Sequence, residues 1–217
     1  DMGNYYGSGA CGLNYNANEY RASFAPGRTG AIARFIGTTP KLPGVEFINQ
    51  MLTGTPSSGD QGYIFGSPYT KLRYLRGSVP GGRKSFSIRG SLPDPPLFVA
   101  QAFTNYLAGK GIPVDGEPTT SRLLSAAGMK MPKLSGEPLE TIQSATLGAL
   151  IKKTNMKSVN IRAEAFLKAM GARGGKPGST KKGAEVIVGH WKGKGINLTN
   201  FKVSDGSGLS RDNLVSA

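Results

Sequence analysis

One short segment of the sequence combines side chains that could take part in acid–base chemistry. Ser158-Val159-Asn160 lies between two stretches whose apolar residues have helical spacing. A serine hydroxyl can relay a proton, and an asparagine carboxamide can both donate and accept hydrogen bonds. Two such residues, two positions apart on a turn, can direct both side chains into one cleft. A purely structural role is also open, because Ser158 or Asn160 could cap the helix that follows.

A second segment, further along the chain, is rich in glycine and serine. It reads Val203-Ser204-Asp205-Gly206-Ser207-Gly208-Leu209-Ser210-Arg211-Asp212-Asn213. Asp and Gly at successive positions are typical of turns, because glycine tolerates positive φ and the Asp side chain can bond to nearby backbone. The sequence therefore predicts a tight turn at 205–208, directly after a short strand at 201–203.

The two segments together resemble motifs of one enzyme family. Ser158-Val159-Asn160, preceded by Asn155 and followed by Ala163-Glu164, is similar to the second active-site motif of the class C D-Ala-D-Ala carboxypeptidase/endopeptidases. These enzymes are penicillin-binding proteins of serine peptidase family S13. The run 205–211 resembles the family's Asp-Gly-Ser-Gly-Leu-Ser-Arg segment and is the more specific match. The segment 3–10 resembles the start of the region that these enzymes insert into their peptidase domain. Residues 15–135 contribute little that is specific to the resemblance.

The resemblance implies a reaction and a role for each matching residue. In such enzymes the serine of a Ser-x-x-Lys motif attacks the carbonyl of the penultimate D-Ala, and the lysine acts as its base. Ser158 would relay a proton toward the leaving D-Ala nitrogen, and Asn160 would hold the catalytic lysine and the substrate amide. The residues implied to lie beside the active site are Asp205, Gly206, Ser207, Gly208 and Ser210.

The resemblance also implies partners and a location. The parent enzyme would act on a peptidoglycan peptide, bind β-lactams, need no cofactor, and work in the periplasm or cell envelope. Neither Lys-Thr-Gly nor Lys-Ser-Gly occurs here, and the single Ser-x-x-Lys, Ser179 to Lys182, follows the Ser-x-Asn motif instead of preceding it. We interpret Ser179 as a helix N-cap. The chain is therefore expected to be an internal fragment that lacks the nucleophile and is inactive alone.

Composition and charge exclude some classes of protein and leave one alternative function open. The 217 residues carry 27 Lys and Arg against 13 Asp and Glu, a net charge of +14, and 38% hydrophobic residues exclude wholesale disorder. No apolar run reaches the length of a membrane span, and no signal peptide is recognisable. Nucleic acid is not an expected partner, because the basic residues lack interleaved aromatics. The alternative function is a non-catalytic basic module that binds an anionic cell-wall polymer or a partner protein.

Cysteine and histidine are too few for several kinds of site. Cys11 is the single cysteine and His190 the single histidine, so an intrachain disulfide and a zinc cage of cysteines are excluded. We expect no metal site. Cys11 stands among small residues, and we expect it to be a small buried hydrophobe.

The pattern of apolar residues predicts an α+β fold in two parts, divided near residue 135. The first part, 1–135, is read as a β-rich, non-catalytic inserted region, and the second, 136–217, as a mainly helical slice of a penicillin-binding/β-lactamase-like peptidase domain. Strands are predicted at 19–24, 31–36, 63–65, 72–79 and 85–90, the last two as a hairpin across 80–82. The apolar spacing of 45–52 fits a short helix or a strand, and we favour the helix. Further helices are predicted from an N-cap at Asp94 to Gly109, and near 139–150, 161–169 and 184–191. Residues 112–135 are expected to be a connecting strand or loop.

Overall fold

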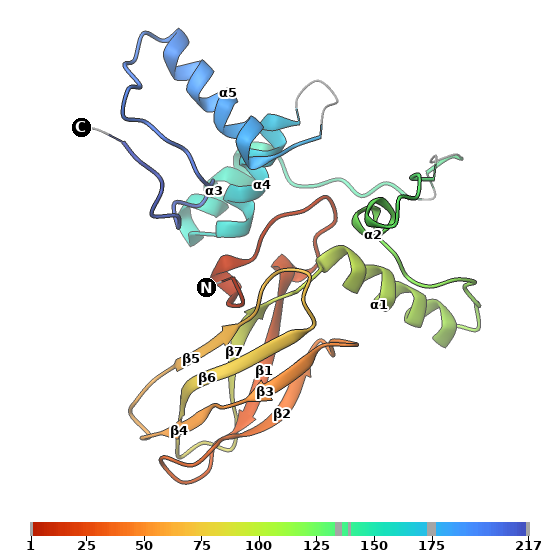
Figure 1. Ribbon diagram of the computed structural model, residues 1–217, viewed down its shortest axis with the longest axis vertical. Helices are drawn as coiled ribbons and strands as arrows, with labels where there is room; N and C mark the ends of the chain where they lie inside the picture. Colours follow the sequence, from red (N-terminus) through yellow and green to blue (C-terminus); the bar gives the residue numbers. More distant parts are fainter. Residues whose placement is uncertain (1, 133–135, 139, 173–176, 216–217) are drawn as a thin grey trace. The chain divides into compact units, whose positions relative to one another are not determined.

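The protein folds into two compact units, Asp1–Thr141 and Ile142–Ala217. A computed structural model describes residues 2–132, 136–138, 140–172 and 177–215. Both sheets belong to the first unit, and helices α3, α4 and α5 belong to the second (Figure 1). The α+β fold class predicted from the sequence is confirmed, and the observed division follows residue 141, where the sequence suggested 135.

The first sheet is antiparallel and has strand order β2-β1-β7. Its strands are β1 (Glu19–Ala25), β2 (Arg34–Thr39) and β7 (Phe86–Ser91). Along β1 the side chains of Tyr20, Ala22 and Phe24 are buried, which is the period-two pattern that predicted this strand. Strand β2 begins three residues later than the predicted start at Ala31.

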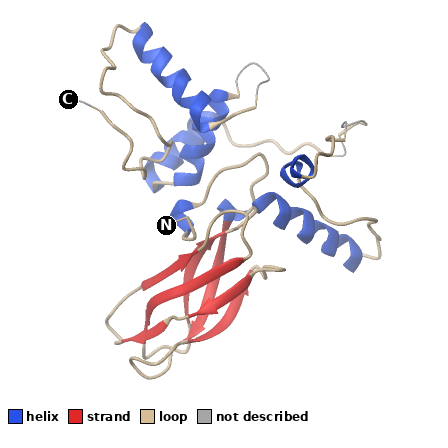
Figure 2. Cartoon of the chain, in the orientation of Figure 1, coloured by secondary structure: helices blue, strands red, loops and turns tan. Residues whose placement is uncertain are grey.

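The second sheet is built around one long strand. It contains β3 (Glu46–Asn49), β4 (Leu52–Gly54), β5 (Gln61–Phe65) and β6 (Leu72–Pro80). Strand β6 pairs in parallel with β3 and β4 and antiparallel with β5. Figure 2 shows the strands of both sheets gathered in one β-rich body. Its core lies between the two sheets, where Tyr20, Phe24 and Ile88 meet Ile64, Leu75 and Val79.

The helix favoured for 45–52 is wrong, because this stretch forms strands β3 and β4, and the strand was the other interpretation of its spacing. The ring of Phe47 lies 6.1 Å from that of Tyr20 and 5.0 Å from that of Phe35, so β3 contributes to the core as a strand does. The Asn49 carboxamide donates to the carbonyl of Ala33 at 2.8 Å and accepts from the amide of Met51 at 3.1 Å. These two hydrogen bonds fix the bend between β3 and β4.

The hairpin predicted for 72–79 and 85–90 is also wrong, although both segments are strands. Strands β6 and β7 belong to different sheets. Pro80 is still paired with Gly54 of β4, and the amide of Gly81 donates to the carbonyl of Gly54 at 3.2 Å. The connection after Pro80 therefore crosses from one sheet to the other.

Two helices of the first unit follow the strands. Helix α1 (Pro95–Gly109) begins as predicted, with the carboxylate of Asp94 accepting from the amide of Leu97 at 3.3 Å. Helix α2 (Ser121–Ala126), capped by Thr120, lies where the sequence suggested a connecting strand or loop. Six residues are too few to show an apolar period.

Cys11 is partly exposed, so the expectation that it is buried is wrong.

A buried arginine orders the loop between β5 and β6. The side chain of Arg73 is only 1% exposed. Its guanidinium donates to the carbonyls of Ser67, Thr70 and Leu72 and to the hydroxyl of Thr70, at 2.8 to 3.1 Å. Burial lowers the pKa of Arg73, and the neighbouring Tyr20 opposes this shift. Backbone carbonyls thus take the place of a carboxylate, and they hold residues 67–72 in one conformation.

The described residues of the second unit form three helices and a long C-terminal segment. The helices are α3 (Leu147–Lys157), α4 (Asn160–Gly171) and α5 (Thr180–Gly193). Helix α3 starts later than predicted, at an N-cap formed by Thr146, and Leu139 lies outside the described residues. Ser179 caps α5 as predicted, with its hydroxyl accepting from the amide of Lys182 at 3.2 Å. The strand predicted at 201–203 is reduced to one bridge between Lys202 and Leu214.

Among the described residues, no helix combines the length and the apolar character that a membrane crossing requires.

Helices α4 and α5 approach each other at a glycine. A Cβ atom on Gly183 would overlap the carbonyl oxygen of Leu167 on α4, and Gly183 is buried. By contrast, Gly189 on the same helix has open space where its Cβ would be.

We predict opposite effects for alanine at these two positions of α5. Gly183→Ala should lower the free energy of unfolding by about 1–3 kcal/mol, because the helices must separate. Gly189→Ala should raise it by up to about 1 kcal/mol, because alanine is the better helix former. Urea denaturation followed by circular dichroism measures both, and equal effects at the two sites would contradict the close approach.

Candidate active site

The turn between α3 and α4 holds Ser158 in an unusual backbone conformation. Ser158 ends α3 with φ 50° and ψ 57°, in the left-handed region, and its amide bonds to the carbonyl of Thr154. Glycine is the common residue at such a helix end, and a residue with a Cβ costs about 1–2 kcal/mol there. The side chain of Ser158 is exposed. The turn therefore presents this hydroxyl to solvent at an energetic cost.

Asn160 is the first residue of α4 and is partly buried. The N-cap position of α4 is Val159, whose apolar side chain makes no cap hydrogen bond. The structural alternative, in which Ser158 or Asn160 supplies the cap, is therefore wrong. Ser158 therefore precedes the N-cap position of α4, and Asn160 follows it.

The segment from Ser204 to Asn213 folds into a loop around one carboxylate. Asp205 accepts hydrogen bonds from the amides of Gly208 at 2.7 Å and Ser210 at 2.5 Å, and from the carboxamide of Asn213 at 2.8 Å. The Asn213 side chain in turn accepts from the amide of Ser204 at 2.8 Å. The predicted turn is thus a loop whose conformation is set by Asp205 and Asn213.

The loop is held against the first turns of α4. One oxygen of the Glu164 carboxylate accepts from the amides of Gly206 and Ser207, both at 3.0 Å, and from the Ser207 hydroxyl at 2.8 Å. A Cβ on Gly206 would lie 2.5 Å from the carbonyl oxygen of Ala163, so glycine is needed for this approach. Glu164 follows Asn160 by four residues, which places the two on the same face of α4.

The structure therefore brings the two sequence-predicted segments to one helix. Ser158 and Asn160 stand at its start, and the loop containing Asp205, Gly206, Ser207, Gly208 and Ser210 lies on its first turns. Ser179 belongs to a different element, the N-terminus of α5.

Two residues that the sequence reasoning did not assign carry this arrangement. Glu164 joins the loop to α4, and Asn213 closes the loop on itself. The sequence did hold a signal for Glu164, because it stands one helical turn after Asn160 in a predicted helix. Asn213 could be found only as the last residue of the glycine- and serine-rich segment.

Hydrogen bonding sets the charge state of Asp205. Its partial burial would raise the pKa, but the hydrogen bonds from Asn213, Ser210 and Gly208 outweigh this effect and lower the pKa below the ordinary value of 3.8. Asp205 is therefore an ionised structural acceptor at neutral pH. A general acid at this position would need a raised pKa.

No cluster of metal-ligating side chains is found among the described residues.

Comparison with known proteins identifies the family. The family of D-Ala-D-Ala carboxypeptidase 3 (S13) matches residues 1–217. The chain belongs to this family. It is similar to a D-alanyl-D-alanine carboxypeptidase of Actinomadura sp. (strain R39), with 25% identity over 172 residues, which are 79% of this chain and 31% of the relative.

Solved structures agree with the S13 assignment at the level of the fold. One structure of penicillin binding protein 4 from Haemophilus influenzae matches with a TM-score of 0.73 and 21% identity, covering 100% of this chain and 46% of that one. A second structure of that protein, in complex with a β-lactam, matches with a TM-score of 0.70 and 20% identity, over 96% and 47% of the two chains. The chain thus spans less than half of the length of these relatives.

The Glu164 contact leads to a prediction about stability. Glu164→Ala should lower the free energy of unfolding by about 1–3 kcal/mol, because three donors lose their charged acceptor. Glu164→Gln should have a smaller effect, because its carboxamide oxygen can still accept. Hydrogen exchange at the amides of Gly206 and Ser207 should accelerate in the alanine variant.

The exposed Glu185 on α5 offers a matched control for this removal of charge. Glu185→Ala should change stability by no more than about 0.5 kcal/mol and leave exchange in the loop unchanged. If both variants behaved alike, Glu164 would not be what holds the loop.

The lowered pKa of Asp205 predicts a dependence of stability on pH. A carboxyl whose pKa is lower in the folded state stabilises the fold above its unfolded pKa, and this contribution is lost as the pH falls through the folded pKa. Asp205→Asn should therefore destabilise the protein at pH 7 and flatten the acid limb of its stability curve below about pH 4. Urea midpoints from pH 2 to 7 test this, and parallel curves for the two proteins would refute it.

Proposed function

We propose that this chain is part of a serine-type D-Ala-D-Ala carboxypeptidase/endopeptidase that trims peptidoglycan stem peptides through an acyl-serine intermediate. The observation that carries the proposal is the convergence of Ser158, Asn160 and the 205–210 loop on the start of α4. Membership of the S13 family and the carboxypeptidase name of the Actinomadura relative support it. In the whole enzyme this site would also bind β-lactams, and a structure of penicillin binding protein 4 from H. influenzae is of a complex with a β-lactam.

In this proposal Ser158 transfers a proton and Asn160 orients the reacting groups. The Ser158 hydroxyl relays a proton toward the nitrogen of the leaving D-Ala, which requires it to be accessible, as it is. The Asn160 carboxamide can donate to a substrate carbonyl and accept from the base of the nucleophile. Asp205 and Glu164 position the loop and do not exchange protons with the substrate.

The resemblance implies a Ser-x-x-Lys motif, with the nucleophile and its base, that precedes the Ser-x-Asn motif, and this chain has no Ser-x-x-Lys before Ser158. The single Ser-x-x-Lys begins at Ser179, whose hydroxyl is occupied as the N-cap of α5. We therefore propose that the 217 residues alone are inactive and that the first unit is a non-catalytic inserted region. Since its substrate would be the cell wall, we place the whole enzyme in the periplasm or cell envelope.

The test is acylation by a fluorescent penicillin. The whole protein in which this segment occurs should be labelled, and the 217-residue chain should not. In the whole protein, Ser158→Ala should reduce kcat/KM for a D-Ala-D-Ala peptide by about 10²–10⁴-fold, because the proton relay is lost. Ser144→Ala, at an exposed serine of the same unit, should leave activity unchanged. Labelling of Ser158 or Ser179 in the 217-residue chain would overturn the proposal.

Ser158→Gly separates the role of the hydroxyl from that of the turn. Glycine accepts the left-handed conformation of this position without strain, so stability should rise by up to about 1 kcal/mol while activity falls as in Ser158→Ala. Full activity in the glycine variant would show that the hydroxyl takes no part.

A further inference from the structure

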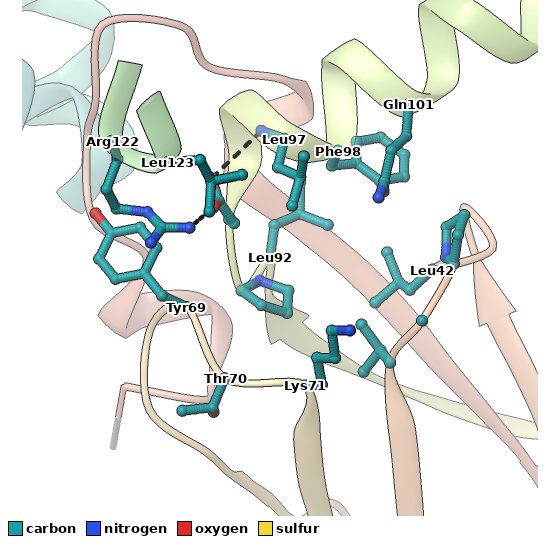
Figure 3. A pocket seen from close by; sticks show the side chains of 15 residues that line it. Leu42, Tyr69, Thr70, Lys71, Leu92, Leu97, Phe98, Gln101, Arg122 and Leu123 are labelled. Carbon is teal, nitrogen blue, oxygen red and sulfur yellow. Dashed lines mark hydrogen bonds and ion pairs between the residues drawn. The ribbon is translucent and has the colours of Figure 1, made fainter. Parts of the chain in front are cut away.

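The first unit contains a cavity that the proposed peptidase chemistry does not use. Its volume is about 240 Å³, and it lies between the 42–45 segment, the 69–71 loop and the N-terminal turns of α1 and α2 (Figure 3). Apolar side chains make up most of its wall, and they include Leu42, Val45, Leu92, Leu97, Phe98 and Leu123. A small apolar body would therefore be favoured inside it.

The polar groups at this cavity leave one positive charge uncompensated. The carboxylate of Asp94 pairs with Arg122 at 2.7 Å and also caps α1. Lys71 points into the cavity from one side and Gln101 from the other (Figure 3). Among the described residues, Lys71 has no carboxylate at ion-pair distance, since the pairs found are Arg122 with Asp94 and Arg89 with Glu19. The lining residues therefore carry a net charge of +1, which resides on the exposed ammonium of Lys71.

The wall that carries Lys71 is held in place before any ligand arrives. The guanidinium of Arg73 bonds to Ser67 and Thr70, which fixes the loop on the N-terminal side of Lys71. On the same loop, the ring of Tyr69 lies 4.3 Å from the guanidinium of Arg122. A preformed site binds with a smaller entropic cost than one that must be ordered.

We propose that this cavity binds an apolar monocarboxylate, with the apolar body among the leucines and the carboxylate on Lys71 and Gln101. One cation and a mainly apolar wall do not suit a polyanion, which needs several cations, and a ligand ammonium would be repelled by Lys71. Two sources share this chemistry, a free aliphatic acid and the C-terminal carboxylate of a peptide that ends in an apolar residue. The site lies wholly within the first unit, whereas the turn at Ser158 belongs to the second.

The experiment is an NMR titration of the 217-residue chain, followed through leucine methyl groups. Octanoate stands for the aliphatic acid and N-acetyl-leucine for the peptide terminus, with octanol and N-acetyl-leucinamide as their neutral partners. At least one acid should shift the methyls of Leu97 and Leu123 and bind about tenfold tighter than its neutral partner. The acid that shows the larger preference identifies the source.

A pair of variants tests the role of the lysine. Lys71→Gln should weaken binding of the acid about tenfold and leave the neutral partner unaffected. Lys84→Gln makes the same charge change at an exposed lysine outside the cavity and should behave as the unmodified chain. The proposal is overturned if neither acid shifts these methyls, if acid and neutral partner bind equally, or if the two variants give the same affinity.

Discussion

At Gly183 and at Gly206, other segments of the second unit approach helix α4 at backbone-contact distance. Gly183 brings α5 against the carbonyl of Leu167, and Gly206 brings the C-terminal loop against the carbonyl of Ala163. A side chain at either glycine would meet backbone, which cannot move aside as a flexible side chain can. The second unit is therefore arranged around one helix, and the Ser158 turn leads directly into that helix.

Backbone contact fixes how closely the loop can approach, and hydrogen bonds to acidic side chains fix its shape. Asp205 collects two amides and a carboxamide from inside the loop, while Glu164 collects two amides and a hydroxyl from its rim. A carboxylate is suited to this task because it only accepts, and bonds to a charged acceptor are stronger than neutral ones. In the first unit the roles are reversed, because the Arg73 side chain is the donor and backbone carbonyls of the loop accept its hydrogen bonds.

What the sequence could predict depended on whether the deciding contact was local. The alternation of Tyr20, Ala22 and Phe24 and the Asp94 cap are local, and both were correct. The apolar spacing of 45–52 fits a helix or a strand, and the sequence favours the helix, whereas pairing with β6, more than twenty residues away, makes this stretch two strands. The sequence also predicts the turn after Pro80. The residues of the turn do not indicate that the strands it connects, β6 and β7, belong to different sheets.

The same distinction applies to the site, and it bears on why Ser158 is a serine. Residue type and spacing drew attention to Ser158, Asn160 and the 205–210 loop, but the role of Glu164 exists only once the loop is folded. At a left-handed helix end glycine would be more stable than serine. The exposed hydroxyl makes no contact that would repay this cost in the described hydrogen-bond network of the turn. A residue that costs stability and contributes none locally is typical of a functional position, which supports the proton relay that the resemblance to the S13 motif implies for Ser158.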